Sequence, residues 1–302
     1  MSTLYTESMR FLLGVLLAAP AISQTAEDAR AILRRVSEEA GVFARTAPDL
    51  VTQETLRQLS LRKKKRFRPR IGAAALRPPD LEYQSRQIVS EYAYGKLKES
   101  AGLHEFRQVI TVDGKPVQSS EAARKTLVLG IRSPDDAARR QLLKDFERYG
   151  LYGAATDFGQ LILLFTREKL GDYAFSAGGK RLLGADSVVV LRYRSHPGKG
   201  SLVVFDDKQA HHLEISGELW VRASDYVPLR VTLIAPRTEH ETVSVTEASV
   251  DYAPSAHSVV TPVSALHREI VSQVVTMENQ FRYQPFQKFG SESGLKFDVD
   301  PK

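Results

Sequence analysis

Alternation of apolar and polar residues is clearest in residues 212–235, which read HLEISGELWVRASDYVPLRVTLIA. Apolar side chains at every second position of an extended segment share one face, which predicts a strand with that face buried. Ser224 and Asp225 then supply turn chemistry, Pro228 is tolerated at a strand start, and the alternation resumes in residues 229–233. We therefore expect an antiparallel hairpin inside a larger sheet. The apolar residues of its buried face are Leu213, Ile215, Leu219, Val221, Leu229, Val231 and Leu233.

The same period predicts strands in other parts of the chain. Residues 105–112 end at Asp113-Gly114, a dipeptide favoured in two-residue hairpin turns. Residues 49–59 fit a strand or a helix, and we favour an extended segment. Residues 269–283 are predicted to form one long strand, with Val271, Val275, Met277, Phe281 and Tyr283 on one face. A strand over residues 86–95 would place Ile88, Ser90, Tyr92 and Tyr94 together. Short strands at this spacing indicate an antiparallel meander.

Helical spacing of apolar residues occurs in two regions. Residues 29–43 predict an N-terminal helix. Residues 119–166 predict a helical section, in which Ser119 and Ser133 are the expected N-caps. The apolar run in residues 157–166 fits a buried helix or a central strand, and we favour the helix because it has few β-branched residues.

These elements predict an α+β fold built on an antiparallel sheet. The 302 residues are 42% hydrophobic and 26% charged, as in an ordinary globular protein with a sizeable core. The chain has no cysteine, which excludes disulfides, thiol nucleophiles and cysteine-ligated metals. We expect residues 24–302 to form a single domain.

Residues 1–23 are predicted to be a signal peptide. A basic residue precedes the apolar run in residues 11–19, and Ala21 and Ser23 suit the −3 and −1 positions of a cleavage site. The run is too short for a membrane span, which needs about 20 apolar residues, but an uncleaved N-terminal anchor is the alternative. Because no cysteine follows the run, a lipoprotein anchor is not expected. We expect a periplasmic or secreted protein.

Residues 57–70 contain eight basic residues and no acidic one. The whole chain carries a net charge of +6, so the remainder is mildly acidic. Such a run can bind an anionic lipid surface or an envelope polymer, or can be a solvated connection whose charges keep it extended. Nucleic-acid binding is not expected of an exported protein. The candidates for anionic-surface binding are Arg62, Lys63, Lys64, Lys65, Arg66, Arg68 and Arg70.

Motifs for enzyme or metal chemistry are not found in the sequence. His211 and His212 would point to opposite faces of a strand and cannot readily share a metal. There is no H-E-x-x-H and no G-x-S-x-G motif. Residues 198–201 lack the spacing of a phosphate-binding loop. We expect no catalytic residue, no bound metal and no cofactor.

The hairpin resembles one found in a known superfamily. Gly217-Glu218-Leu219-Trp220-Val221, with the turn and strand that follow, is similar to the hairpin of periplasmic lipoprotein-carrier (LolA-like) proteins, and residues 281–297 resemble the tail of uncharacterised exported bacterial proteins. The resemblance implies that the antiparallel sheet is curved into an incomplete barrel, with helices packed over its concave face as a lid on a hydrophobic cavity. The basic run and the longer helical section depart from that pattern. No counterpart of a functional arginine of the carriers can be placed, so no functional residue is transferred.

Two functions follow from this reading. The first is an exported carrier or sensor that binds an apolar ligand, such as an acyl chain or lipid, between sheet and helices. The second is an envelope scaffold or interaction module that contacts anionic lipid or polymer through its basic run, and a solid interior would favour it. The sequence predicts no oligomeric state. The residues predicted to line a ligand cavity are Leu219, Val231, Leu233, Val275, Met277 and Phe281.

Overall fold

The computed structural model describes residues 21–62, 81–98, 102–149, 158–206, 209–239 and 241–289. Its helices are α1 (Ala21–Thr46), α2 (Ser120–Arg132) and α3 (Asp136–Glu147), and its 3-10 helices are η1 (Ala47–Asp49), η3 (Leu161–Phe165) and η4 (Leu170–Asp172). Its strands are β1 (Leu50–Leu61), β2 (Tyr83–Lys96), β3 (Leu103–Val112), β4 (Lys115–Pro116), β5 (Tyr173–Leu183), β6 (Asp186–Ser195), β7 (Leu202–Asp206), β8 (Gln209–Leu213), β9 (Ser216–Arg222), β10 (Pro228–Glu239), β11 (Thr242–Pro254), β12 (Val260–Val271), β13 (Val274–Tyr283) and β14 (Gln287–Lys288).

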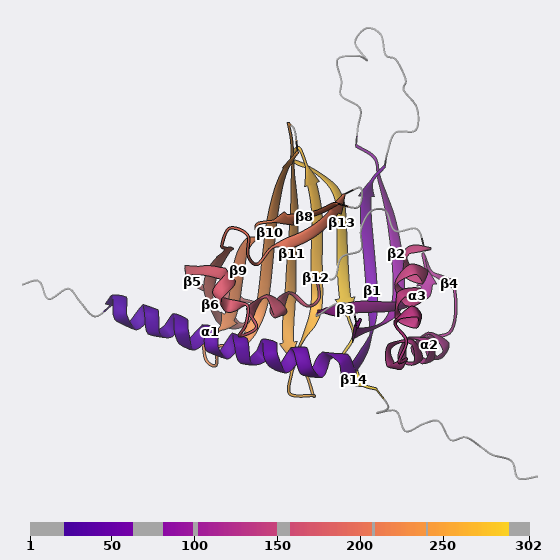
Figure 1. Cartoon of the computed structure of the whole chain (residues 1–302), viewed down its shortest axis with the longest axis horizontal. Coiled ribbons are helices and arrows are strands. Elements are labelled where there is room, and N and C mark those ends of the chain that lie inside the picture. Colours follow the sequence, from indigo (N-terminus) through magenta and orange to yellow (C-terminus); the bar gives the residue numbers. More distant parts are fainter. Residues whose placement is uncertain are drawn as a thin grey trace, which may run out of the picture.

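One large antiparallel sheet of 12 strands dominates the structure (Figure 1). Its strands follow the order β4-β3-β2-β1-β13-β12-β11-β10-β9-β6-β5, with β14 paired to β1, while β7 and β8 form a separate ribbon. Within the described residues the two ends of the large sheet, β4 and β5, do not pair with each other, so the barrel is incomplete. The predicted α+β fold with an open antiparallel sheet is confirmed.

The two faces of the sheet differ because side chains alternate along each strand. Leu56 of β1 is paired with Ile88 of β2 and with Phe281 of β13, and all three are buried. In the predicted hairpin, Leu219 of β9 is paired with Val231 of β10, and both are fully buried. We call this face, which packs against α1 and η3, the inner face. The opposite one is the outer face.

Helix α1 runs across the lower end of the sheet in Figure 1. It packs through Ile32, Val36, Ala40 and Phe43, which recur at helical spacing and are buried. The helix begins at Ala21, earlier than the sequence pattern predicted, and includes the residues expected around the cleavage site. Residues 1–20 lie outside the described residues, so the signal peptide stays a prediction. No helix of the described chain is long and apolar enough to cross a membrane.

Helices α2 and α3 lie at the β1–β3 end of the sheet (Figure 1). A second buried cluster joins them to the outer face there: Val51, Ala93, Phe106, Leu127, Ile131 and Leu142. The Ser119 hydroxyl caps α2 by accepting a hydrogen bond from the Ala122 amide, at 3.2 Å. The prediction that Ser133 caps α3 is wrong, because Asp135 is the N-cap. The Ser133 hydroxyl instead accepts from the Asp135 amide, a local turn that competes with capping.

Two predicted elements differ from the structure. Residues 269–283 form two strands, not one, because Ser272 and Gln273 take positive φ values of 48° and 66° and reverse the chain. These residues are uncommon in such turns, so the turn was not recognised. Residues 157–166 were predicted to form a helix, and the described part is the 3-10 helix η3. Its backbone bonds span three residues, as from the Leu163 amide to the Gln160 carbonyl at 2.9 Å.

Candidate functional site

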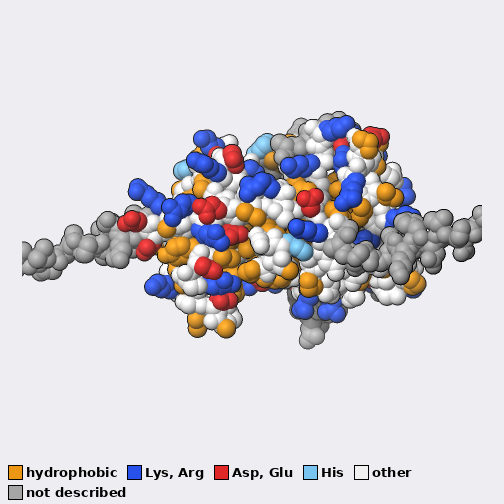
Figure 2. All heavy atoms as spheres, turned by 90° about the horizontal axis from the view of Figure 1, so that it is seen from below, with side chains coloured by type: hydrophobic (Ala, Val, Ile, Leu, Met, Phe, Trp, Pro, Cys, Tyr) orange, Lys and Arg blue, Asp and Glu red, His pale blue; other side chains and the backbone are white. Residues whose placement is uncertain are grey.

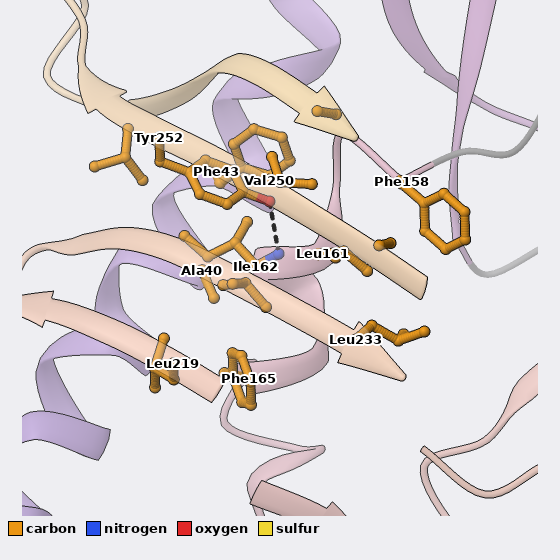
Figure 3. Close-up of a cluster of buried hydrophobic side chains, with 14 of the residues drawn as sticks. Ala40, Phe43, Phe158, Leu161, Ile162, Phe165, Leu219, Leu233, Val250 and Tyr252 are labelled. Carbon is orange, nitrogen blue, oxygen red and sulfur yellow. Dashed lines mark hydrogen bonds between the residues drawn. The ribbon is translucent and has the colours of Figure 1, made fainter. Parts of the chain in front are cut away.

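The space between the inner face and α1 is filled by residues 158–165, which we call the plug. The plug inserts Phe158, Leu161, Ile162 and Phe165, all buried, into the main hydrophobic core. Figure 3 shows Ile162 and Phe165 close to the strands that carry Leu219 and Val250, with α1 nearby. The sheet side of this space is apolar, with Leu219, Leu233 and Val250 among the labelled residues, and Ala40 and Phe43 of α1 lie on the other side.

One tyrosine hydroxyl ties the plug to the sheet. Tyr252 Oη on β11 accepts a hydrogen bond from the Ile162 amide at 3.0 Å and donates one to the Gly159 carbonyl at 3.1 Å (Figure 3 shows the first bond). Gln160 Nε2 adds a bond to the Leu103 carbonyl at 3.0 Å. Burial raises the pKa of Tyr252, so the phenol stays protonated and can donate and accept at once.

The residues predicted to line a ligand cavity all belong to the inner face. Val275 is half-buried, whereas the other five are buried: Leu219, Val231, Leu233, Met277 and Phe281. They are not spread over both faces, because each lies at an inward position of β9, β10 or β13. Leu233 belongs to the same buried cluster as the four apolar side chains of the plug. Whether these residues meet a ligand stays a prediction.

Beside the plug, the inner face of β1–β3 carries a buried ion pair. Arg107 Nε and Nη2 donate to the two carboxylate oxygens of Glu54 at 2.8 and 2.9 Å, and Nη2 also donates to Glu105 at 2.7 Å. All three side chains are 3% exposed or less. Burial by itself lowers the pKa of Arg107, but the two carboxylates outweigh it and hold that pKa well above its usual value. The guanidinium therefore stays charged inside the protein, packed against the rings of Tyr92, Phe146 and Phe281.

Two tyrosine hydroxyls lie next to this ion pair and directly beneath the plug. Tyr92 and Tyr94 are fully buried, with their rings edge to face at 5.2 Å. Neither hydroxyl has a hydrogen-bond partner of acceptable geometry in the described structure, although Tyr92 is close enough to Tyr94 to lower its pKa as a hydrogen-bond partner would. A Cβ atom on Gly159 of the plug would lie 2.9 Å from Tyr92 Oη, 3.1 Å from Tyr94 Oη and 2.9 Å from Glu105 Oε1. Three oxygens thus converge on one glycine. We call Tyr92, Tyr94 and Glu105 the polar floor.

The polar floor remains uncharged at its two phenols. Burial raises the pKa of Tyr92 and of Tyr94 well above that of an exposed tyrosine, and the charge of Glu105 raises both further. The inner face is therefore apolar beside η3 and polar beside Gly159. Sequence analysis placed both tyrosines on one face of a strand but did not identify Glu54, Glu105 or Arg107.

A groove of about 770 Å³ crosses the outer face of β5, β6 and β9–β12. Its walls include Arg192 and Arg194, which alternate along β6 with buried inward residues. Arg192 lies 3.6 Å from Glu218, another wall residue. Of the predicted cavity residues, Leu233 is among those that line the groove. The cavity was expected on the other face, so the groove does not test that prediction.

The basic run lies almost wholly outside the described residues. Arg62 is described, is exposed, and has Nη1 3.8 Å from a carboxylate oxygen of Glu82. The other candidates for anionic-surface binding, at positions 63–70, are not described, so that role stays a prediction. Seen from below, the described surface mixes basic and acidic side chains (Figure 2). Across the described chain, no three His, Asp or Glu side chains are grouped as metal ligands would be.

Comparison with known proteins gives a distant structural likeness. No family model matches the sequence, and no curated protein matches it. A proposed outer membrane lipoprotein-sorting protein domain from Vibrio parahaemolyticus is similar at a TM-score of 0.37 and 9% identity, over 89% of this chain and 95% of that one. A DUF1329 family protein from Desulfovibrio piger ATCC 29098 gives 0.35 and 9%, over 87% and 94%. A LolA superfamily protein from Nitrosomonas europaea gives 0.28 and 11%, over 86% and 93%.

The predicted distant resemblance to LolA-like proteins is thus present among solved structures. At these TM-scores and identities it transfers no residue role, so the function is argued from the side chains of this chain.

Proposed function

We propose that this protein is an exported carrier or sensor that binds an apolar ligand, such as an acyl chain or lipid. The ligand takes the space between the inner face and α1 that the plug occupies. The supporting observation is that a single short segment, not a second layer of helices or strands, supplies the four buried side chains there: Phe158, Leu161, Ile162 and Phe165.

The plug is built to be displaceable. A helix as short as η3 is not stable by itself, so its shape depends on the surfaces around it. Its side-chain bonds to the sheet described above come from two residues, Tyr252 and Gln160. The surfaces that it covers, including Leu233 and Val250, would pack equally well against an acyl chain.

The plug also sets the size of ligand that could replace it. Burying one large apolar side chain contributes about 1.5–3 kcal/mol, so the four plug side chains contribute on the order of 6–12 kcal/mol. A buried methylene group contributes ~0.8 kcal/mol, and an acyl chain of roughly 8–15 methylene groups therefore offsets the loss. The upper part of this range includes the saturated 16-carbon acyl chain of membrane lipids.

Binding of N-phenyl-1-naphthylamine, which fluoresces in apolar surroundings, tests the proposal with two matched variants. Tyr252→Phe removes both hydroxyl bonds to the plug. Tyr193→Phe also removes a buried hydroxyl bond, but that bond joins two strands, from Tyr193 Oη to the Thr232 carbonyl at 2.6 Å. Each lost bond is worth about 0.5–1.5 kcal/mol. We expect Tyr252→Phe to bind the probe roughly tenfold more tightly than the parent, and Tyr193→Phe to bind it like the parent.

If the two substitutions change the affinity for the probe equally, the plug does not control access of the probe to the space between the inner face and α1. If neither the parent nor the variants bind the probe, the carrier function is wrong. The alternative is an envelope interaction module, which is favoured by one observation: in this conformation the space beside Leu233 is filled by the chain's own side chains.

A further inference from the structure

We infer that the polar floor, Tyr92, Tyr94 and Glu105, is a head-group subsite for an uncharged, hydroxyl-bearing end of the ligand. The inference rests on the proposed function and adds the chemical class of the ligand: a single-chain lipid with a neutral hydroxyl head, such as a monoacylglycerol. The tail lies where Leu161, Ile162 and Phe165 now lie.

Two buried phenols supply most of the polar floor. Tyr92 and Tyr94 are completely buried, and their hydroxyls make no hydrogen bond of acceptable geometry in the described structure. Folded proteins leave few buried polar groups unsatisfied, because each such group destabilises the fold. Two adjacent cases on one strand indicate a surface made to meet a partner other than the segment that covers it here.

The polar floor lies directly against the plug. The part of the plug above them is Gly159, and a side chain there would come within 3.1 Å of all three oxygens of the polar floor. When the plug leaves, the two hydroxyls and Glu105 Oε1 therefore face the same point. Gly159 also precedes Ile162 by one turn of the plug, and Tyr252 Oη bonds both residues. The polar floor and the space filled by the apolar side chains of the plug are thus continuous, so one lipid could place its head group at the first and its tail in the second.

The groups of the polar floor favour a head group without charge. A phenol can donate one hydrogen bond and accept others, and burial keeps both of these phenols neutral. An anionic head would lie against the buried carboxylate of Glu105 and be repelled. A cationic head would lose its water beside a carboxylate that Arg107 already holds at 2.7 Å. An uncharged hydroxyl group avoids both penalties and matches the donors and acceptors present.

Competition against N-phenyl-1-naphthylamine tests the subsite with two lipids that share one tail. 1-Monooleoylglycerol has a hydroxyl head, and oleate has a carboxylate. We expect the parent to prefer monooleoylglycerol, and the double variant Tyr92→Phe/Tyr94→Phe to lose about five- to a hundredfold of that preference, as two hydrogen bonds predict. The preference is the ratio of the two competitor affinities within one variant, so a change in the affinity for N-phenyl-1-naphthylamine itself cancels out.

Thermal unfolding adds a readout that does not depend on ligand. Tyr92→Phe and Tyr94→Phe remove hydroxyls that make no hydrogen bond of acceptable geometry, so each should change Tm only slightly. The control Tyr193→Phe removes the bond to Thr232 and should lower Tm without altering head-group preference. Tm losses at Tyr92 or Tyr94 as large as that of the control would overturn the subsite. A preference for oleate, or one unchanged in the double variant, would also overturn it while leaving apolar binding in place. Absence of probe binding to the parent would overturn both proposals.

Discussion

Arg107 is the residue whose loss should harm the fold most clearly. Its guanidinium bridges Glu54 and Glu105 and is 3% exposed, with the two carboxylates 1% and 0% exposed. In Arg107→Met the flexible thioether fills much of the same space, but both carboxylates stay buried without the cation. The substitution therefore tests the loss of the positive charge more than the loss of side-chain volume.

The size of the effect follows from this burial. Removing one partner of a buried ion pair destabilises a protein by about 3–5 kcal/mol, because the remaining charge is left uncompensated. In a domain of this length, 1 kcal/mol corresponds to roughly 2–4 °C in Tm. Arg107→Met should therefore lower Tm by about 6–20 °C. A matched control is Arg230→Met on the outer face, where the pair with Asp251 is 29% and 31% exposed.

The control should lose far less, since water screens that pair and a surface ion pair contributes about 0–1 kcal/mol. Urea unfolding followed by circular dichroism measures both variants against the parent. If Arg107→Met loses no more stability than Arg230→Met, the buried cluster does not exist as described. That result would also mean that Glu105 is not held at its position in the polar floor, because Arg107 is the residue that binds it there.

Two further outcomes are expected. Leu219→Asp should lower the free energy of unfolding by several kcal/mol, because it buries an unpaired charge. Ile234→Asp, at a 42% exposed outer-face position, should change it by about 0.5 kcal/mol, and similar losses would mean that the faces are misassigned. Replacing the four basic residues 63–66 with Gln should leave Tm unchanged and weaken binding to anionic vesicles in a salt-dependent way, by about 1 kcal/mol per residue. Unchanged vesicle binding would show a solvated connection.

Strand pattern was the most informative part of the sequence. A sheet with one strongly buried face forces apolar side chains into alternate positions, which is why Leu219 and Val231 could be placed on the buried face of a hairpin. Asp113-Gly114 likewise identified a turn, and both residues take positive φ values of 49° and 76°. By contrast, Ser272 and Gln273 reverse the chain without the residues that usually signal such a turn, so two strands looked like one.

The site was harder to predict, because its parts come from separate strands. Glu54 and Arg107 are 53 residues apart and meet only when β1, β2 and β3 pair. One local signal was present: Glu54 occupies an inward position between Thr52 and Leu56, where an apolar residue is expected. A charged residue at such a position indicates a buried partner. The plug gave no such signal, since an apolar run has no periodicity that separates a 3-10 turn from a buried helix.

The two regions of the inner face have different consequences for binding. The fraction of molecules with the plug displaced scales the apparent affinity of any ligand that needs its space. An acyl chain alone replaces apolar contacts with apolar contacts, so it gains little over the plug. The hydroxyls of Tyr92 and Tyr94 change this balance, because each unmade bond raises the free energy of the closed state by about 1–3 kcal/mol. A ligand that bonds both hydroxyls makes interactions that Gly159, with no side chain, cannot make. On this reasoning the apolar space sets which chain lengths fit, and the polar floor sets which ligands outcompete the plug.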